Sequence, residues 1–209
     1  MNIYEEIEKY KIVPVVVLKD AQNAVDLAKA LIAGGLPVAE VTFRTEAAEE
    51  AIRTIVKELP DMLVGAGTIT TAEQAKRALD AGARFLVTPG FSRSVTEFAV
   101  KQSCPIFPGV CTPTELMMAQ EYHLSVVKFF PAAQYGGLNT IKALSGPFPQ
   151  IRFMPTGGIN AGNIKEYLGN PKIIACGGSW MVKDSLIQEG RFDEIERLTA
   201  EAVSLINEN

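Results

Sequence analysis

The chain has 209 residues, of which 47% are hydrophobic, and its formal net charge at pH 7 is -4. This length is enough to bury a full core, and it predicts a single compact domain over residues 1–209. The acidic balance and the absence of a Lys/Arg run exclude nucleic acid and a membrane surface as partners.

The three cysteines and the single histidine support no metal site. Cys104, Cys111 and Cys176 lack metal-ligand or redox spacing, and His123 has no second imidazole to act with. Reduced thiols, no membrane-length apolar stretch and no signal-peptide pattern predict a cytoplasmic protein without metal or cofactor. We assign these four residues no role.

Short apolar runs recur along the chain, and each is followed by an amphipathic stretch with helical periodicity. Alternating strands and helices predict a parallel sheet, and eight such units predict an α/β TIM (β/α)8 barrel, with residues 2–10 as a short additional helix covering its bottom. An open doubly wound sheet is the alternative, but no G-x-G-x-x-G follows the first run. The eight runs comprise residues 12–18, 37–43, 62–67, 84–88, 105–109, 124–130, 151–156 and 172–178.

Polar side chains share one face of the second and third runs. In EVTFRT, Glu40 and Arg44 alternate with the apolar residues that face the helices, so both must point into the barrel or its mouth. Buried charges require partners, and a structural Glu-Arg or Glu-Lys ion pair is the alternative to a catalytic role. In LVGAGT, Gly65 and Gly67 leave room for a cavity or for close packing, and Thr68 supplies a hydroxyl at the rim.

One lysine interrupts the apolar sixth run, SVVKFFPAA. Lys128 lies near the carboxyl end of this predicted strand, because Pro131 ends it. Burial among Val and Phe would remove water from the amine, and a free amine is a nucleophile that forms Schiff bases with carbonyl substrates. The alternative is a lysine that extends past its apolar neighbours to solvent.

Paired glycines follow the seventh and eighth runs, in PTGGIN and CGGSW. TIM barrels frequently bind phosphate through the backbone N–H groups of these two loops. The sequence therefore predicts a phosphate site formed by Gly157, Gly158, Gly178 and Ser179, with ordinary turn glycines as the alternative.

Taken together, the motifs EVTFRT, VGAGT, VTPGF, PGVCTPTE, VKFFPA, FMPTGGIN and GGSWM resemble the 2-keto-3-deoxy-6-phosphogluconate (KDPG) and 4-hydroxy-2-oxoglutarate (KHG) aldolase family over essentially the whole chain. The resemblance implies a class I aldolase, a lyase of the Entner-Doudoroff pathway that needs no metal. Such an enzyme cleaves 2-dehydro-3-deoxy-6-phosphogluconate to pyruvate and glyceraldehyde 3-phosphate. It also implies a homotrimer whose small-molecule partner is a 2-keto acid. Cleavage of 4-hydroxy-2-oxoglutarate to pyruvate and glyoxylate remains open.

The resemblance also assigns roles to individual residues. It implies that Lys128 is the Schiff-base lysine and that Glu40 is the general acid/base. The residues implied to bind substrate are Arg44 and Thr68 for the carboxylate, Pro89 and Phe130 for the pocket wall, and Thr156, Gly157, Gly158 and Ser179 for the phosphate. Where some relatives have an arginine at the end of the first strand, this chain has Leu18 and Lys19.

Two other functions are compatible with the same site. An isomerase or synthase of a phosphorylated metabolite would use Lys128 as an electrostatic group only. A non-catalytic phosphosugar-binding protein would keep the pocket without turnover, and it is disfavoured because Glu40, Arg44, Thr68 and Lys128 are all present.

Overall fold

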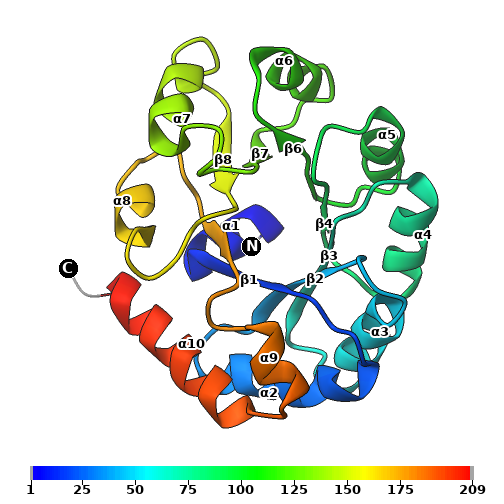
Figure 1. Ribbon diagram of the computed structural model, residues 1–209. Helices are drawn as coiled ribbons and strands as arrows, with labels where there is room; N and C mark the ends of the chain where they lie inside the picture. The colour runs from blue at the N-terminus through cyan, green and yellow to red at the C-terminus, as the bar shows by residue number, and fades with distance from the viewer. Residues whose placement is uncertain (1, 208–209) are drawn as a thin grey trace.

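The computed structural model describes residues 2–207, so the first residue and the last two of the predicted domain lie outside the described residues. Its strands lie at the centre and its helices surround them (Figure 1). The strands are β1 Ile12–Val16, β2 Val38–Thr42, β3 Leu63–Gly67, β4 Leu86–Val87, β5 Ile106–Phe107, β6 Gly109–Val110, β7 Val126–Phe129, β8 Arg152–Pro155 and β9 Cys176–Gly178. The helices are α1 Ile3–Tyr10, α2 Ala24–Ala33, α3 Ala48–Glu58, α4 Ala72–Asp80, α5 Arg93–Lys101, α6 Pro113–Glu121, α7 Gly137–Ser145, α8 Ile164–Leu168, α9 Asp184–Gln188 and α10 Phe192–Asn207, with a 3-10 turn at Ala21–Asn23.

The described strands pair in parallel and form two sheets. One has six strands in the order β5-β4-β3-β2-β1-β9, and the other has three in the order β6-β7-β8. Neighbours in space are mostly neighbours in the chain, without the order reversal of a doubly wound sheet. The predicted α/β alternation is confirmed, and the larger sheet forms a half-barrel.

Proline explains why the fifth apolar run yields two strands instead of one. Pro108 separates β5 from β6, and it has no N–H to give to a ladder. Its carbonyl still accepts a hydrogen bond from the Lys128 N–H at 2.9 Å, so the chain passes from one sheet into the other at this residue. At the opposite edge, isolated bridges join Phe153 to Ile173 and Thr156 to Gly177.

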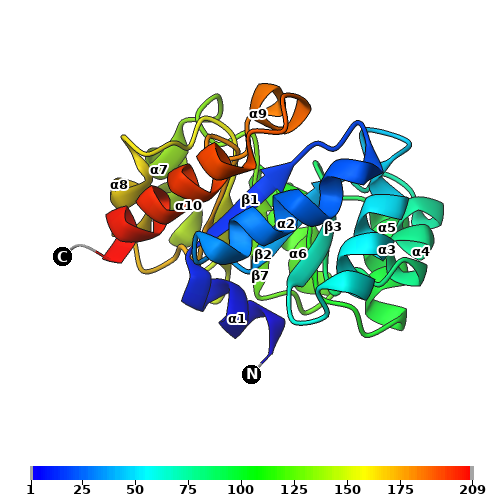
Figure 2. The ribbon, with the colours of Figure 1, turned by 90° about the horizontal axis from the view of Figure 1, so that it is seen from below.

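The predicted N-terminal helix is present and covers the amino ends of the strands (Figure 2). Asn2 and Glu5 form a reciprocal capping box, which satisfies two N–H groups that the first turn leaves unpaired. Tyr4 packs edge-on against Phe107 with 5.1 Å between ring centroids, and Ile7 is fully buried. The helix therefore closes the bottom of the strand array.

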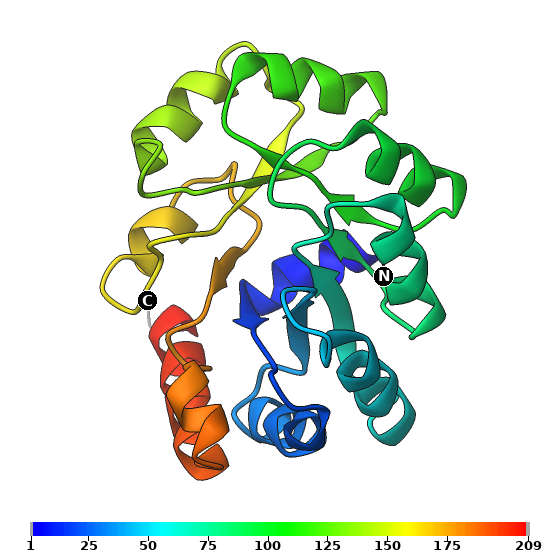
Figure 3. The same cartoon turned by 45° about the vertical axis from the view of Figure 1, so that its right-hand side comes forward.

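The last helix packs against the first long one. Gly34, after α2, lies so close to α10 that a Cβ atom there would come within 2.5 Å of the Thr199 Cβ. Figure 3 shows α10 beside α2. The last helix of the chain therefore lies next to the first helix of the outer layer. None of the described helices is long and apolar enough to cross a membrane.

Two local features differ from the sequence expectation. Residues 160–169 are the amphipathic stretch expected to be helical after the seventh apolar run, and they are helical only over Ile164–Leu168. The short helix α9, Asp184–Gln188, corresponds to no expected helical stretch. Five residues show too little of a 3.6-residue period to define the bounds of α8 or to reveal α9.

Candidate active site

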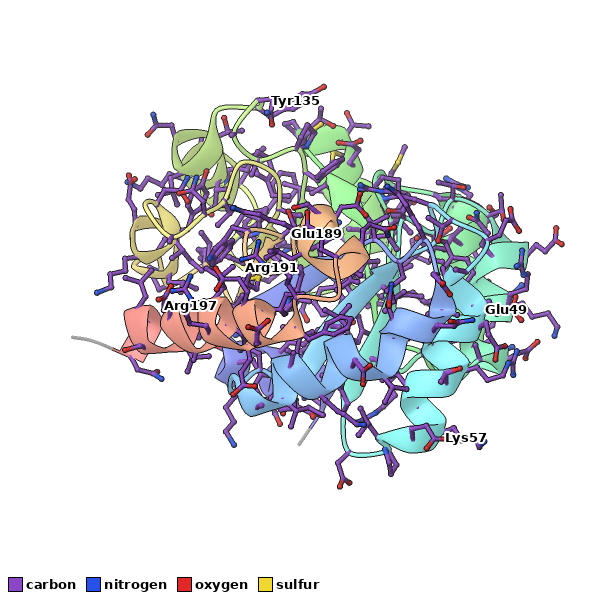
Figure 4. The ribbon with its side chains drawn as sticks, turned by 60° about the horizontal axis from the view of Figure 1, so that its bottom comes forward. Glu49, Lys57, Tyr135, Glu189, Arg191 and Arg197 are labelled. Carbon is purple, nitrogen blue, oxygen red and sulfur yellow. The ribbon has the colours of Figure 1, made fainter. Side chains whose placement is uncertain are left out.

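Lys128 and Glu40 are the two charged residues within 2–207 whose side chains are buried. Their residues are 3% and 0% exposed. Charged side chains elsewhere lie on the outer surface, as Glu49, Lys57, Glu189, Arg191 and Arg197 do in Figure 4. Removing a charge from water costs free energy unless the charge is paired, so two buried charged side chains are expected to interact with each other or with a ligand.

The two side chains meet across the interior of the strand array. Lys128 Nζ donates a hydrogen bond to Glu40 Oε1 at 3.3 Å, although β7 and β2 are not neighbours in either sheet. The ammonium also lies 5.1 Å from the centroid of the Phe130 ring, whose face attracts a cation. Of the two ion pairs considered from the sequence, the structure contains the Glu-Lys pair.

Glu40 keeps one oxygen available. Its Oε2 is buried and has no hydrogen-bond partner among the described residues. Buried carboxylate oxygens normally have a hydrogen-bond partner, and Oε2 has none from the described protein atoms. It is therefore available to accept a proton from a substrate hydroxyl or from a water molecule. Gly67 provides the space, because a Cβ atom there would lie 2.1 Å from Glu40 Oε1.

Gly65, the other glycine of β3, makes room for a core side chain and not for Glu40. A Cβ atom on Gly65 would lie 2.2 Å from the Phe85 ring, so this position makes room for an aromatic side chain in the core. The idea that both glycines open a substrate cavity is wrong for Gly65, where the close-packing alternative holds.

Arg44 and Thr68 stand together at the carboxyl ends of β2 and β3. Arg44 Nε donates to Thr68 Oγ1 at 3.1 Å. Arg44 is exposed and Thr68 half-buried, with Thr68 in the left-handed region at φ 55°. The two terminal guanidinium nitrogens of Arg44 can still bind a carboxylate as a fork.

A cavity of about 520 Å³ lies where the loops after β8 and β9 meet, and Gly158 and Ser179 are among its lining residues. Gly157 and Gly158 have φ of 100° and 76°, a conformation that glycine adopts without a steric penalty. Gly178 contributes differently, because the place of its missing side chain is taken by the Trp180 ring. The structure brings together the two predicted glycine loops.

Thr156 lies between the reactive pair and these loops. Its hydroxyl is buried, has no partner among the described residues, and adjoins Gly177. Its N–H donates to the Phe129 carbonyl at 2.9 Å, which places it one step beyond β7 toward the carboxyl end. Pro89, at the end of β4, and Phe130, after Lys128, are both half-buried near the same end.

Sequence reasoning gave no site role to Thr88, which anchors the turn that contains Pro89 through hydrogen bonds to the backbone of Gly90 and Gly109. It expected Gly67 to leave room, and the structure shows that the group using this room is the Glu40 side chain. The signal for Gly67 was its place on the same face as Glu40 in the next strand. A hydroxyl before Pro-Gly was the signal for Thr88.

The cysteines lie in environments that suppress their reactivity. Burial raises the pKa of Cys104 to about 11 and that of Cys176 to about 12, because it disfavours the thiolate. His123 is exposed. No group of three or more His, Cys, Asp or Glu side chains within residues 2–207 could hold a metal ion.

Comparison with known proteins places these residues in context. Residues 3–198 match the family model described as KDPG and KHG aldolase. The chain is 48% identical over 205 residues to the 2-dehydro-3-deoxy-phosphogluconate aldolase of Haemophilus influenzae, covering 98% of this chain and 97% of that protein. It is 44% identical over 192 residues to the KHG/KDPG aldolase of Escherichia coli, covering 92% and 90%.

A solved structure is also similar. The KDPG aldolase of Legionella pneumophila, with pyruvate captured at low pH as a covalent carbinolamine intermediate, superimposes with a TM-score of 0.93 at 40% identity. The match covers 97% of this chain and 98% of the other.

Proposed function

Since this chain belongs to the KDPG and KHG aldolase family, we propose that it is a class I aldolase that cleaves 2-dehydro-3-deoxy-6-phosphogluconate to pyruvate and glyceraldehyde 3-phosphate. The observation that carries the proposal is the buried pair of Lys128 and Glu40, in which an amine lies 3.3 Å from a carboxylate that has one free oxygen. The name of the Escherichia coli relative supports 4-hydroxy-2-oxoglutarate as a second substrate.

The chemistry begins at the amine. Lys128 Nζ first passes a proton to Glu40, and the resulting neutral amine attacks the C2 carbonyl of the keto acid. Glu40 returns that proton to the carbinolamine hydroxyl, which leaves as water, and a protonated imine remains. This imine accepts the electron pair that is released when the bond between C3 and C4 breaks. No other electron sink is required.

Glu40 moves the protons. Its free Oε2 accepts the C4 hydroxyl proton as the aldehyde forms, and the resulting acid returns a proton to C3 of the enamine. Water then releases pyruvate from Lys128. One carboxyl group thus serves first as base and then as acid.

The remaining residues hold the two ends of the substrate. Arg44 and Thr68, joined by their own hydrogen bond, bind the carboxylate at the barrel mouth. Pro89 and Phe130 line the pocket. The distal phosphate binds to the opposite group, which comprises Thr156, Gly157, Gly158, Gly178 and Ser179.

Closure of the strands into one (β/α)8 barrel is part of this proposal. The passage from β5 to β6 through Pro108 and the bridges between the β8 and β9 segments support it at both sheet boundaries. A contiguous buried core from Ile7 to Ala202 supports a single domain. Assembly as a homotrimer rests on the family resemblance, and light scattering coupled to gel filtration tests it.

The test of the function is covalent trapping. Pyruvate with borohydride should add one reduced pyruvyl group to Lys128, located by peptide mass spectrometry, and Lys128→Ala should not be labelled. Labelling of another lysine, or none, would sink the assignment. It would favour the isomerase or synthase alternative, in which Lys128 is only a charge. Turnover that persists in EDTA is the second expected result.

A further inference from the structure

Thr88 occupies an unusual point where β4 ends. Its N–H continues the sheet by donating to the Phe107 carbonyl at 3.2 Å. The next ladder bond should run from the Gly109 N–H to the Thr88 carbonyl, but that N–H donates instead to Thr88 Oγ1 at 3.0 Å. The hydroxyl therefore replaces a backbone acceptor at the residue where the chain turns away.

The same hydroxyl also holds the turn. Thr88 Oγ1 donates to the Gly90 carbonyl at 2.7 Å, so one buried oxygen joins the Pro89–Gly90 segment to the neighbouring strand. Thr88 itself is fully buried, and its bond with the Gly109 N–H is buried, whereas its bond to the Gly90 carbonyl is partly buried. Loss of the hydroxyl would leave the buried Gly109 N–H without its acceptor, which is unfavourable.

The turn that Thr88 holds lies beside Lys128. Gly109 and Lys128 are register partners in adjacent parallel strands, so their side-chain directions share the interior face. A Cβ atom on Gly109 would lie 2.4 Å from the Pro89 carbonyl carbon and 2.6 Å from the Gly90 nitrogen. The Pro89–Gly90 peptide thus fills the space next to the base of the Lys128 side chain.

We propose that Thr88 is a positioning residue for the aldolase reaction. Its hydroxyl bonds to both Gly90 and Gly109 and so holds the Pro89–Gly90 peptide against Gly109. This peptide forms the wall along which a keto acid approaches Lys128 Nζ. This inference rests on the proposed function. It assigns Thr88 no contact with substrate. Its effect passes through the peptide wall, and a displacement of about 1 Å in such a wall costs up to 10²-fold in rate.

Four variants separate positioning from simple stability. Thr88→Val keeps the shape and loses both bonds, whereas Thr88→Ser keeps the hydroxyl. Thr199→Val is the matched control, because Thr199 is also fully buried and its hydroxyl donates to a backbone carbonyl, that of Ile195 at 2.7 Å, far from the site in α10. Gly109→Ala leaves Thr88 intact, but its Cβ atom would clash with the Pro89–Gly90 peptide and displace it.

The measurements are the rate of borohydride-trapped pyruvate adduct, kcat/KM for cleavage, and the folded fraction by circular dichroism. Thr88→Val should lower the trapping rate and kcat/KM by about 10- to 100-fold while the protein stays folded. Thr88→Ser should stay within about threefold of wild type, and Thr199→Val should lose stability with activity within about twofold. Gly109→Ala should slow trapping as Thr88→Val does.

A wild-type trapping rate in folded Thr88→Val would overturn the role of Thr88, as would an equal loss of activity in Thr199→Val. If Thr88→Val does not fold, Gly109→Ala decides, and an unchanged trapping rate there overturns the inference. Failure of the wild-type protein to trap pyruvate at all would overturn the proposed function, and this inference with it.

Discussion

The two ends of the proposed substrate site use different groups, which are side chains at one end and main-chain N–H groups at the other. At the reactive end, Lys128 and Glu40 are side chains almost without solvent contact, 3% and 0% exposed, and each is placed by the other. At the distal end, Gly158 and Ser179 are exposed at a cavity of about 520 Å³, where main-chain N–H groups are the available donors. Covalent chemistry needs a few fixed groups shielded from water, whereas anion binding needs open backbone. Substitutions should therefore remove function at the first end and only weaken it at the second.

The largest effect is expected for Lys128→Arg. Arginine keeps a positive charge that can face Glu40, but it cannot form an imine. Turnover should fall by on the order of 10⁴-fold or more, measured as kcat for cleavage of the phosphorylated substrate. Lys142→Arg, an exposed position on α7, is the control and should behave as wild type. Substantial activity in Lys128→Arg would mean that the lysine acts as a charge alone.

Glu40→Gln should come next. Glutamine keeps the size of the side chain and an oxygen for Lys128, but it cannot accept the C4 hydroxyl proton. The loss in kcat should be about 10²–10⁴-fold, with KM changed little. Steady-state kinetics, with the exposed Glu58→Gln as control, measure it. A kcat within a few-fold of wild type would show that another group transfers the proton.

Gly158→Ala tests the distal end. Its Cβ atom would lie 2.4 Å from that of Ala133, at a residue with φ of 76°, so the loop must shift. We expect kcat/KM for the phosphorylated substrate to fall by roughly 10- to 100-fold, and that for 4-hydroxy-2-oxoglutarate much less, since the latter has no phosphate to lose. Gly190→Ala is matched in strain, with φ of 66°, but nothing lies near its Cβ position, and it should leave both values unchanged. Equal losses on both substrates in Gly158→Ala would mean that the loop supports the fold and binds no phosphate.

The smallest effect is expected for Ser179→Ala. If main-chain N–H groups supply most of the phosphate binding, losing one exposed hydroxyl should raise KM for the phosphorylated substrate by only about two- to fivefold. The same assay checks it, with exposed Ser125→Ala as control. A 100-fold rise would show that the distal end also depends on a single side chain, and the contrast between the two ends would disappear.

The elements and the reactive residue were predictable from local pattern. The eight apolar runs contain all nine described strands except for Val110, because Pro108 divides one run and the chain pairs one residue further. A lysine inside an apolar run, Lys128, is buried as its neighbours indicate. Alternation along β2 placed Glu40 on the interior face, since strand side chains alternate with a period of two.

The glycines show where local pattern stops. Gly65 and Gly67 look alike in LVGAGT, yet Phe85 fills the space beside one and Glu40 the space beside the other. At Gly178, the Trp180 ring occupies the space of the missing side chain. A glycine in a sequence indicates only that a side chain is missing. The group that uses the space comes from another part of the chain.

The amino-acid sequence by itself determined the alternation of strands and helices, the face on which each charged residue lies, and the presence of one amine among apolar neighbours. Only the tertiary structure decided that Glu40 pairs with Lys128 while Arg44 turns to Thr68, and that Thr88 holds the wall beside the lysine. The physical reason is distance along the chain. Side-chain direction follows from the backbone of a few consecutive residues, but Glu40 and Lys128 are 88 residues apart, and their contact is set by how the intervening strands curve.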